Sequence, residues 1–242
     1  MGFDPKKFKD GVFSEKDLLG FDLGKLNPGI FSNKDCKVLF NTIQSRGIKN
    51  VLEIGGRTGR TTSVMVQANP NIKIDVFEKD EDYHDDLESI SPNISVYGNV
   101  IDHPLDINKY DFIFIDGNHD YIFARWYVDQ ILDKCLTQLI HIHDMPLKDN
   151  DLESLDIIQC RIIHADIISV IRLKGIYGLK MYDKYQSGRK QIAELWEGDI
   201  VSQFIQDNDM RFCCTYDGNS DDEVKGVSPQ IQNCSLYMER PF

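Results

Sequence analysis

The stretch VLEIGGRTGRTT, from Val51 to Thr62, places an apolar run, one acid and three glycines close together. The apolar residues are typical of a buried strand, and the glycines let the backbone turn sharply and approach a neighbouring group. The dinucleotide-binding pattern G-x-G-x-x-G fails from either Gly55 or Gly56. What remains is E-x-G-x-x-x-G, formed by Glu53, Gly55 and Gly59. An acid at the mouth of a strand suits a ligand that carries a positive charge.

Two later positions complete the description of that ligand. Glu78 comes 23 residues after Gly55, at the end of the second predicted strand. A carboxylate there is placed to accept hydrogen bonds from both hydroxyls of a ribose. Asn99 follows the third predicted strand, where its amide is suited to pairing with an adenine edge. A cationic group, a ribose and an adenine together describe S-adenosylmethionine (SAM).

At these residues the sequence resembles the class I SAM-dependent methyltransferases, and a second motif narrows the resemblance. FIDGNHDY, from Phe114 to Tyr121, is similar to a motif of the sugar O-methyltransferases of macrolide and aminocoumarin pathways and of cephalosporin-hydroxylase-like proteins. HDMP, from His143 to Pro146, supports this match, whereas Arg57 departs from it as a bulky charge where small residues are common. The resemblance spans roughly residues 49–144. It implies an O-methyltransferase acting on a hydroxyl of a sugar or glycan, with a catechol-type or other small-molecule O-methyltransferase as the alternative.

The resemblance also implies roles for residues after the fourth and fifth predicted strands. His119 stands where related enzymes place the base that takes the hydroxyl proton, and an unperturbed histidine pKa of about 6.5 suits that task. Asp116 and Asp144 would fix the hydroxyl. Asp116, His143 and Asp144 are candidate ligands for a Mg²⁺ or Mn²⁺ ion, and whether a metal binds stays open. Without a metal, Asp144 would orient His119. The predicted cofactor contacts are Glu53, Gly55, Gly56, Arg57, Gly59, Thr61, Glu78, Lys79, Asn99, Val100, Asp116 and His119.

The elements that must position these residues alternate between strand and helix. Strands are predicted at 50–54, 73–77, 93–99, 110–116 and 137–144, and helices at 33–46, 60–68, 81–89 and 121–135. Continuous apolar strands separated by helices favour a parallel sheet flanked by helices. A helix at 192–206 and two strands, 210–216 and 234–240, follow. The predicted fold class is α/β: a doubly wound, mostly parallel seven-stranded Rossmann-like sheet with an antiparallel C-terminal hairpin.

Length and composition indicate one domain. The chain has 242 residues, 41% of them hydrophobic, with 27 basic against 39 acidic side chains and a net charge of −12. A nucleic-acid partner is not expected, because such proteins usually present a basic face. No run of about 18 apolar residues indicates a membrane span. The six scattered cysteines indicate reduced thiols and a cytoplasmic protein. We expect one methyltransferase domain over 1–242, with a helical cap at 1–48 and an acceptor-recognition insertion at 145–190; a homodimer stays open.

Plainer roles and other protein classes also stay open. In the plainer interpretation, the glycines only allow close packing of the strand and the helix, and Asp116 only caps the next helix. His141, on the same strand face as His143, is expected to be buried in the sheet. A nicotinamide-dependent oxidoreductase shares the ribose acid, but its glycine fingerprint fails and no Tyr-x-x-x-Lys appears. A non-catalytic SAM-binding protein would keep Glu53 and Glu78 without needing His119.

Overall fold

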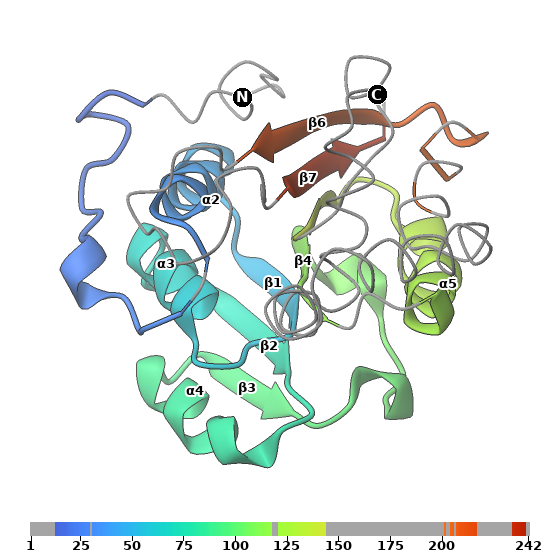
Figure 1. Cartoon of the computed structure of the whole chain (residues 1–242), viewed down its shortest axis with the longest axis horizontal. Helices are drawn as coiled ribbons and strands as arrows, with labels where there is room; N and C mark the ends of the chain where they lie inside the picture. Colours follow the sequence, from blue (N-terminus) through green and yellow to red (C-terminus); the bar gives the residue numbers. More distant parts are fainter. Residues whose placement is uncertain are drawn as a thin grey trace, which may run out of the picture.

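Seven strands form one mixed sheet in the order β3-β2-β1-β4-β5-β7-β6 (Figure 1). The structure, a computed structural model, describes residues 13–29, 31–117, 121–143, 201, 204–205, 207–216 and 234–240. The strands are β1 (Asn50–Ile54), β2 (Lys73–Phe77), β3 (Ile94–Tyr97), β4 (Phe112–Ile115), β5 (Leu139–Ile142), β6 (Arg211–Tyr216) and β7 (Cys234–Glu239).

The strand pairing confirms the predicted fold class. β1 pairs in parallel with β2 and β4, β2 pairs in parallel with β3, and β4 pairs in parallel with β5. β7 runs antiparallel to both β5 and β6, so the C-terminal hairpin forms one edge of the sheet. The result is a Rossmann-like sheet with an antiparallel hairpin, β6 and β7, at its end.

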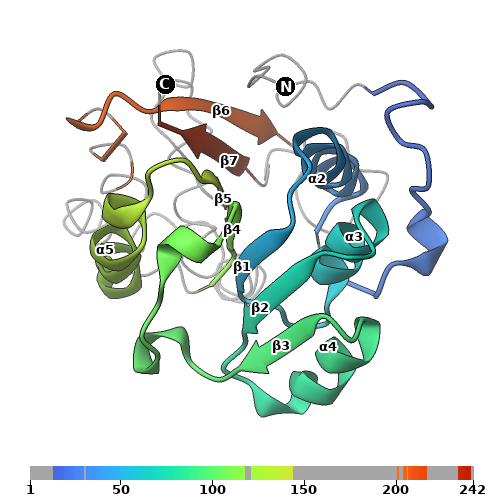
Figure 2. The ribbon, with the colours of Figure 1, turned by 180° about the vertical axis from the view of Figure 1, so that it is seen from behind.

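Helices cover both faces of this sheet, and the alternation of strand residues explains why. Figures 1 and 2 show α2 and α3 on one face and α5 on the other. All four residues of β4 are buried: Phe112 and Phe114 pack with the α2 and α3 side chains, while Ile113 and Ile115 pack with those of α5. The helices are η1 (Leu23–Lys25), α2 (Asn33–Arg46), α3 (Arg60–Ala68), η2 (Glu81–Tyr83), α4 (His84–Ile90), η3 (Val100–Asp102), η4 (Ile107–Lys109), α5 (Tyr121–Gln130) and η5 (Leu132–Lys134).

Local chemistry fixes the ends of α2 at the predicted residues. The Ser32 hydroxyl accepts a hydrogen bond from the backbone N–H of Asp35, which caps the first turn. Gly47 ends the helix with a φ of 64°, in the left-handed region that favours glycine. A short connection then leads into β1, and the glycine-rich loop follows the C-terminal end of that strand.

The structure departs from the sequence prediction mainly in helix lengths. The helix predicted at 81–89 is split into the 3₁₀ turn η2 and the helix α4, and the helix predicted at 121–135 ends at Gln130 before η5. Of the helix predicted at 192–206, Val201, Phe204 and Ile205 are described; all three are helical and buried. Residues 145–190 lie outside the described residues. Within the described ranges, no helix has the length and apolar character needed to cross a membrane.

Candidate functional site

The carboxyl ends of β1, β2 and β4 meet at one edge of the sheet. The last residue of β1 is in register with the last residues of β2 and β4, so Gly55, Glu78 and Asp116 follow side by side. The Gly55 N–H donates to the Phe77 carbonyl over 2.9 Å, and the Asp116 N–H donates to the Ile54 carbonyl over 2.8 Å. The chain winds outward from β1 to β3 and returns to β4, so this edge is the switch point where open α/β sheets bind ligands.

The glycines of the loop after β1 allow close contact with neighbouring elements. Gly55 has a φ of 90°, and a Cβ there would lie 1.8 Å from the backbone oxygen of Asp116. A Cβ on Gly56 would lie 2.5 Å from a β2 side chain, and one on Gly59, at a φ of 78°, would lie 2.4 Å from an α4 side chain. Side chains at these three positions would collide with the strand end, the sheet and the helix. The glycine pattern therefore has a packing role in this fold.

Glu78 joins the end of β2 to that loop. Its Oε2 accepts the backbone N–H of Arg57 over 2.8 Å, and its Oε1 accepts the backbone N–H of Asp80 over 2.9 Å. The residue is 7% exposed. A carboxylate accepts about four hydrogen bonds, so each oxygen keeps acceptor capacity for a ligand. The two backbone donors fix the carboxylate in place before any ligand arrives.

Glu53 is buried beneath the loop. One carboxylate oxygen accepts the Thr61 hydroxyl over 2.5 Å, and the other accepts the Thr62 hydroxyl over 2.8 Å. Burial raises the pKa of Glu53 to about 7, although both threonine hydrogen bonds lower it. Glu53 does not line the neighbouring pocket, whereas Thr61 does. A ligand in that pocket therefore meets Thr61, with Glu53 behind it.

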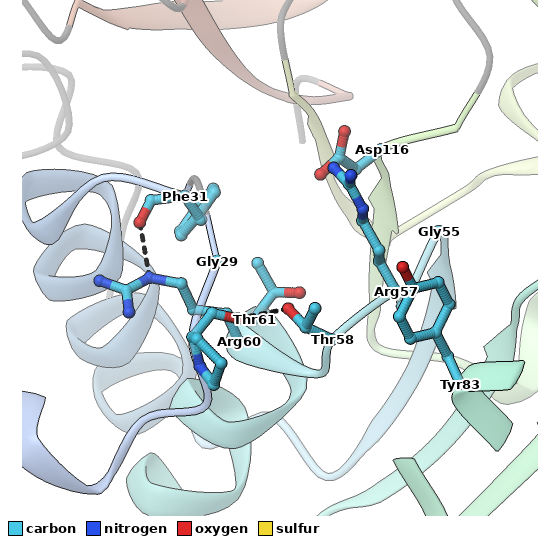
Figure 3. A pocket seen from close by; sticks show the side chains of 11 residues that line it. Gly29, Phe31, Gly55, Arg57, Thr58, Arg60, Thr61, Tyr83 and Asp116 are labelled. Atoms are coloured by element: carbon cyan, nitrogen blue, oxygen red, sulfur yellow. Dashed lines mark hydrogen bonds between the residues drawn. The ribbon is translucent and has the colours of Figure 1, made fainter. Parts of the chain in front are cut away.

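A cavity of about 230 Å³ lies between this loop, α3 and the segment before α2 (Figure 3). Asp116 from the end of β4 and Tyr83 from η2 also line it, so it reaches the switch point. The residues that line the cavity are Pro28, Gly29, Phe31, Gly55, Gly56, Arg57, Thr58, Arg60, Thr61, Tyr83 and Asp116.

One wall of the cavity is the segment from Asn27 to Phe31, of which residue 30 is not described. Arg60 holds this wall: its Nε donates to the Phe31 carbonyl over 2.7 Å, and a terminal nitrogen donates to the Asn27 carbonyl over 3.2 Å. The Asn27 amide in turn donates to the Thr58 carbonyl over 2.9 Å, and the Thr58 hydroxyl donates to the Pro28 carbonyl. These hydrogen bonds attach the N-terminal wall to the glycine-rich loop.

Asp116 and two histidines line up from the cavity into the core. The Asp116 side chain is 30% exposed, and its Oδ1 lies 3.4 Å from Nδ1 of His143, whose side chain is 1% exposed. His141 lies deeper, with its ring 4.3 Å from that of Tyr237 and 4.6 Å from that of Phe114. Neither His141 ring nitrogen has a hydrogen-bond partner among the described residues, and burial lowers its pKa well below the usual value. The predicted burial of His141 is confirmed.

The other predicted cofactor residues lie around the β2 and β3 ends. Asn99 is exposed and caps η3, with its side-chain oxygen accepting the Ile101 N–H over 3.4 Å. Val100 is 4% exposed and packs in the core. Lys79 is exposed beside Glu78. None of these three lines the cavity beside the glycine-rich loop.

The predicted base and metal ligands are only partly described. His119 and Asp144 lie outside the described residues. In the described part of the chain, no group of three or more His, Cys, Asp or Glu side chains is arranged to hold a metal ion. Asp116 and His143, two of the three predicted ligands, lie with Oδ1 and Nδ1 3.4 Å apart.

No local pattern in the sequence marks the residues of the cavity wall. Pro28, Gly29 and Phe31 lie about 30 positions before the glycine-rich loop, and their contacts with it are tertiary. The Pro-Gly pair signals a turn, yet nothing in its spacing indicates what the turn packs against. Tyr83, which also lines the cavity, lies in a segment rich in acidic residues, and no signal there distinguishes it. The neighbouring acids at 81, 82, 85, 86 and 88 are exposed.

Comparison with known proteins places the fold. No protein-family model matches this sequence, and no curated protein matches it. Among solved structures, an O-methyltransferase from Bacillus cereus in complex with S-adenosylhomocysteine (SAH) superposes with a TM-score of 0.52 at 14% identity, over 94% of this chain and 90% of that one. The O-methyltransferase TomG from Streptomyces achromogenes, involved in tomaymycin synthesis and solved with SAM, gives 0.51 at 10% identity, over 99% and 100%.

At these identities the likeness establishes the fold. The chain has the fold of the class I SAM-dependent methyltransferases, and the resemblance predicted from its glycine-rich loop is confirmed at that level. Both neighbours are O-methyltransferases solved with SAM or its product.

Proposed function

We propose that this protein is a SAM-dependent O-methyltransferase that methylates a hydroxyl of a sugar or glycan. The main observation in support is the Glu78 carboxylate at the switch point, which the backbone N–H groups of Arg57 and Asp80 hold in place. A carboxylate fixed at this edge suits the two hydroxyls of a ribose. The fold shared with O-methyltransferases and the motif from Phe114 to Tyr121 support the same reading.

In this proposal the adenosine lies over the ends of β2 and β3, with Glu78 on the ribose and Asn99 at the adenine edge. The acceptor hydroxyl, fixed by Asp116, attacks the SAM methyl group in line with the sulfonium. The new O–C bond forms as the C–S bond breaks, and the electron pair returns to sulfur to give SAH. His119 takes the hydroxyl proton, which makes the oxygen a better nucleophile in the transition state.

The choice of a sugar rests on the family resemblance alone. A catechol-type or other small-molecule hydroxyl is the second candidate, because the same displacement serves any acceptor oxygen. Residues 1–48 and 145–190 are proposed to select the acceptor, and Phe31 already lines the cavity from the first of these segments. A radiolabelled-methyl assay over panels of sugars, glycans and catechols separates the two candidates.

The described residues include two of the three proposed metal ligands, Asp116 and His143, whereas Asp144 lies outside them. The proposed metal ligands Asp116, His143 and Asp144 are tested by chelation followed by addition of Mg²⁺ or Mn²⁺. Turnover restored only by one of these ions would establish the metal. Full turnover after exhaustive chelation would remove it and leave the side chains to fix the hydroxyl.

The cofactor proposal is tested by calorimetry. We expect micromolar binding of SAM and SAH and no binding of NAD. Glu78→Ala should weaken SAM binding by about 1.5–3 kcal/mol, the scale for hydrogen bonds to a charged group. Glu78→Gln, which keeps an acceptor for the loop backbone, serves as the partial-loss control. Tight NAD binding, or unchanged SAM affinity in Glu78→Ala, would refute the proposal.

The base assignment is tested with His119→Ala on the identified acceptor. We expect turnover to fall by about 10²–10⁴-fold, the usual contribution of a general base, while SAM affinity stays nearly constant. A rate that rises with pH and levels off in the wild type, but not in the variant, would identify the titrating base. Full turnover of His119→Ala would assign the proton to another group.

A further inference from the structure

Arg57 has an unusual backbone and an exposed side chain at the cavity. Its φ is 43°, in the left-handed region, which non-glycine residues adopt uncommonly. The Glu78 carboxylate holds this conformation by accepting the Arg57 backbone N–H. Asp209 is the other non-glycine residue with a positive φ in the described part of the chain, and it lies in a surface turn away from the cavity. A left-handed backbone at a cavity wall suggests that the side chain of that residue, here Arg57, has a function in the cavity.

The two arginines that line the cavity differ in their hydrogen bonding. Arg60 donates to the Phe31 and Asn27 carbonyls and to the Asn33 side chain, so its guanidinium serves the cavity wall. None of the described residues accepts a hydrogen bond or forms an ion pair with the Arg57 guanidinium. In Figure 3 the Arg57 side chain extends from the loop toward the end of the cavity that carries Asp116. Arg57 therefore brings a cation with available donors.

The hydroxyl groups of Thr58 and Thr61, beside Arg57, both donate hydrogen bonds within the protein. The Thr61 hydroxyl donates to Glu53, and the Thr58 hydroxyl donates to the Pro28 carbonyl. Each hydroxyl has one proton, so toward the cavity both threonines offer acceptor lone pairs. Lone pairs suit an ammonium group and do not suit a carboxylate. Among the side chains that line the cavity, Arg57 is the cation whose donors none of the described residues accepts, so it is the side chain best suited to an anionic ligand group.

The strand order indicates which part of the cofactor reaches this point. Resting on the proposed function, the ribose lies at the end of β2 with Glu78, and the reacting methyl group faces Asp116 at the end of β4. β1 lies between these strands, so the amino-acid end of SAM extends over the loop that follows β1. That end is a zwitterion with one ammonium and one carboxylate. We propose that the Arg57 guanidinium binds the carboxylate of the cofactor's amino-acid end, while Thr61 accepts from its ammonium.

Calorimetry with two ligands that differ by one carboxylate tests this contact. The ligands are SAH and decarboxylated SAH, in which the amino-acid end is a plain aminopropyl chain. For SAH, Arg57→Gln should lower affinity about 10- to 100-fold, the range for a charge-assisted hydrogen bond. For decarboxylated SAH, wild type and Arg57→Gln should agree within about threefold, because the group that Arg57 binds is missing. Arg57→Lys should recover part of the SAH affinity.

Arg125→Gln is the matched control, since Arg125 is an exposed arginine on α5 that pairs with Asp129 and lies outside the cavity. It should leave both affinities unchanged. Equal losses for both ligands in Arg57→Gln would show that Arg57 only shapes the loop, and would overturn the contact. Unchanged SAH affinity with slower turnover would place the arginine on the acceptor and would also overturn it. If the wild type binds neither SAM nor SAH, the proposed function itself fails.

Discussion

Glu53 beneath the glycine-rich loop and His141 in β5 are both fully buried, but they differ in their hydrogen bonding. Each oxygen of Glu53 accepts a threonine hydroxyl. His141 sits among aromatic rings, and its two nitrogens have no hydrogen-bond partner among the described residues. Burial moves the pKa of both groups toward the neutral form, upward for the acid and downward for the histidine.

The difference shows how one fold handles polar groups near a site and away from it. At the loop, the buried acid is supported by α3 and fixes the Thr61 hydroxyl that lines the cavity. In β5, the histidine contributes a flat ring to the packing and stays neutral. A buried polar group with partners stabilises a defined local geometry, whereas one without partners carries a desolvation cost. The first arrangement is suited to a binding site and the second to a core position.

The largest effect should come from removing one partner of Glu53. Thr62→Val keeps the shape of the side chain but leaves an oxygen of a buried carboxylate without its hydrogen bond. We expect a loss of about 2–3 kcal/mol in the free energy of unfolding at pH 8, where Glu53 is mostly ionised. Urea denaturation of the purified protein measures this loss.

Thr42→Val is the control for that measurement. The Thr42 hydroxyl is also buried, but it donates over 2.7 Å to the Val38 carbonyl within α2, so its removal strands no charge. Its loss should stay below about 1 kcal/mol. Equal destabilisation by the two valine variants would mean that Glu53 does not depend on its threonine partners.

A smaller effect should appear in the pH dependence of stability. The folded-state pKa of His141 lies below the value of about 6.5 for an unfolded chain, so the unfolded chain takes up this proton first as the pH falls. The His141 contribution therefore lowers stability below about pH 6.5, by up to ~1.4 kcal/mol per pH unit. His141→Phe should flatten the stability curve between pH 5 and about 6.5 in urea denaturation.

Glu53 provides the opposite slope within the same experiment. Its pKa rises from 4.5 to about 7 on folding, so the folded state holds the proton longer and stability falls as pH rises through that window. Glu53→Gln should remove this fall while changing stability little at pH 5. If both variants kept the wild-type slopes, neither burial site would control the pH response.

The elements up to β5 could be predicted because their signals are local. Ser32 and Gly47 mark the two ends of α2, and the run from Phe112 to Ile115 is apolar on both faces, as a central parallel strand must be. The split of the predicted helix at 121–135 has no comparable signal. No glycine or proline marks Gln130, where α5 ends.

The candidate site was predicted in part, for the same reason. Glu78 and Asp116 follow strands whose ends must meet at one edge, so their proximity is a consequence of the parallel sheet. Glu53 accepts hydrogen bonds from Thr61 and Thr62 of α3, and its expected role beside a cationic ligand stays a prediction. Which residues from the N-terminal segment close the cavity depends on tertiary packing, which no local pattern in the sequence encodes.

The hydrogen bonds that attach the segment before α2 to Arg60 and Thr58 have a thermodynamic consequence. A ligand in the cavity would contact this wall and the glycine-rich loop together, so it would strengthen their association. Linkage is reciprocal: the factor by which a bound ligand favours the attached wall equals the factor by which the attached wall raises the affinity for the ligand. A change that detaches the wall therefore weakens ligand binding. Affinity for a small molecule is thereby coupled to a stretch of chain that lies some 30 residues upstream of the loop.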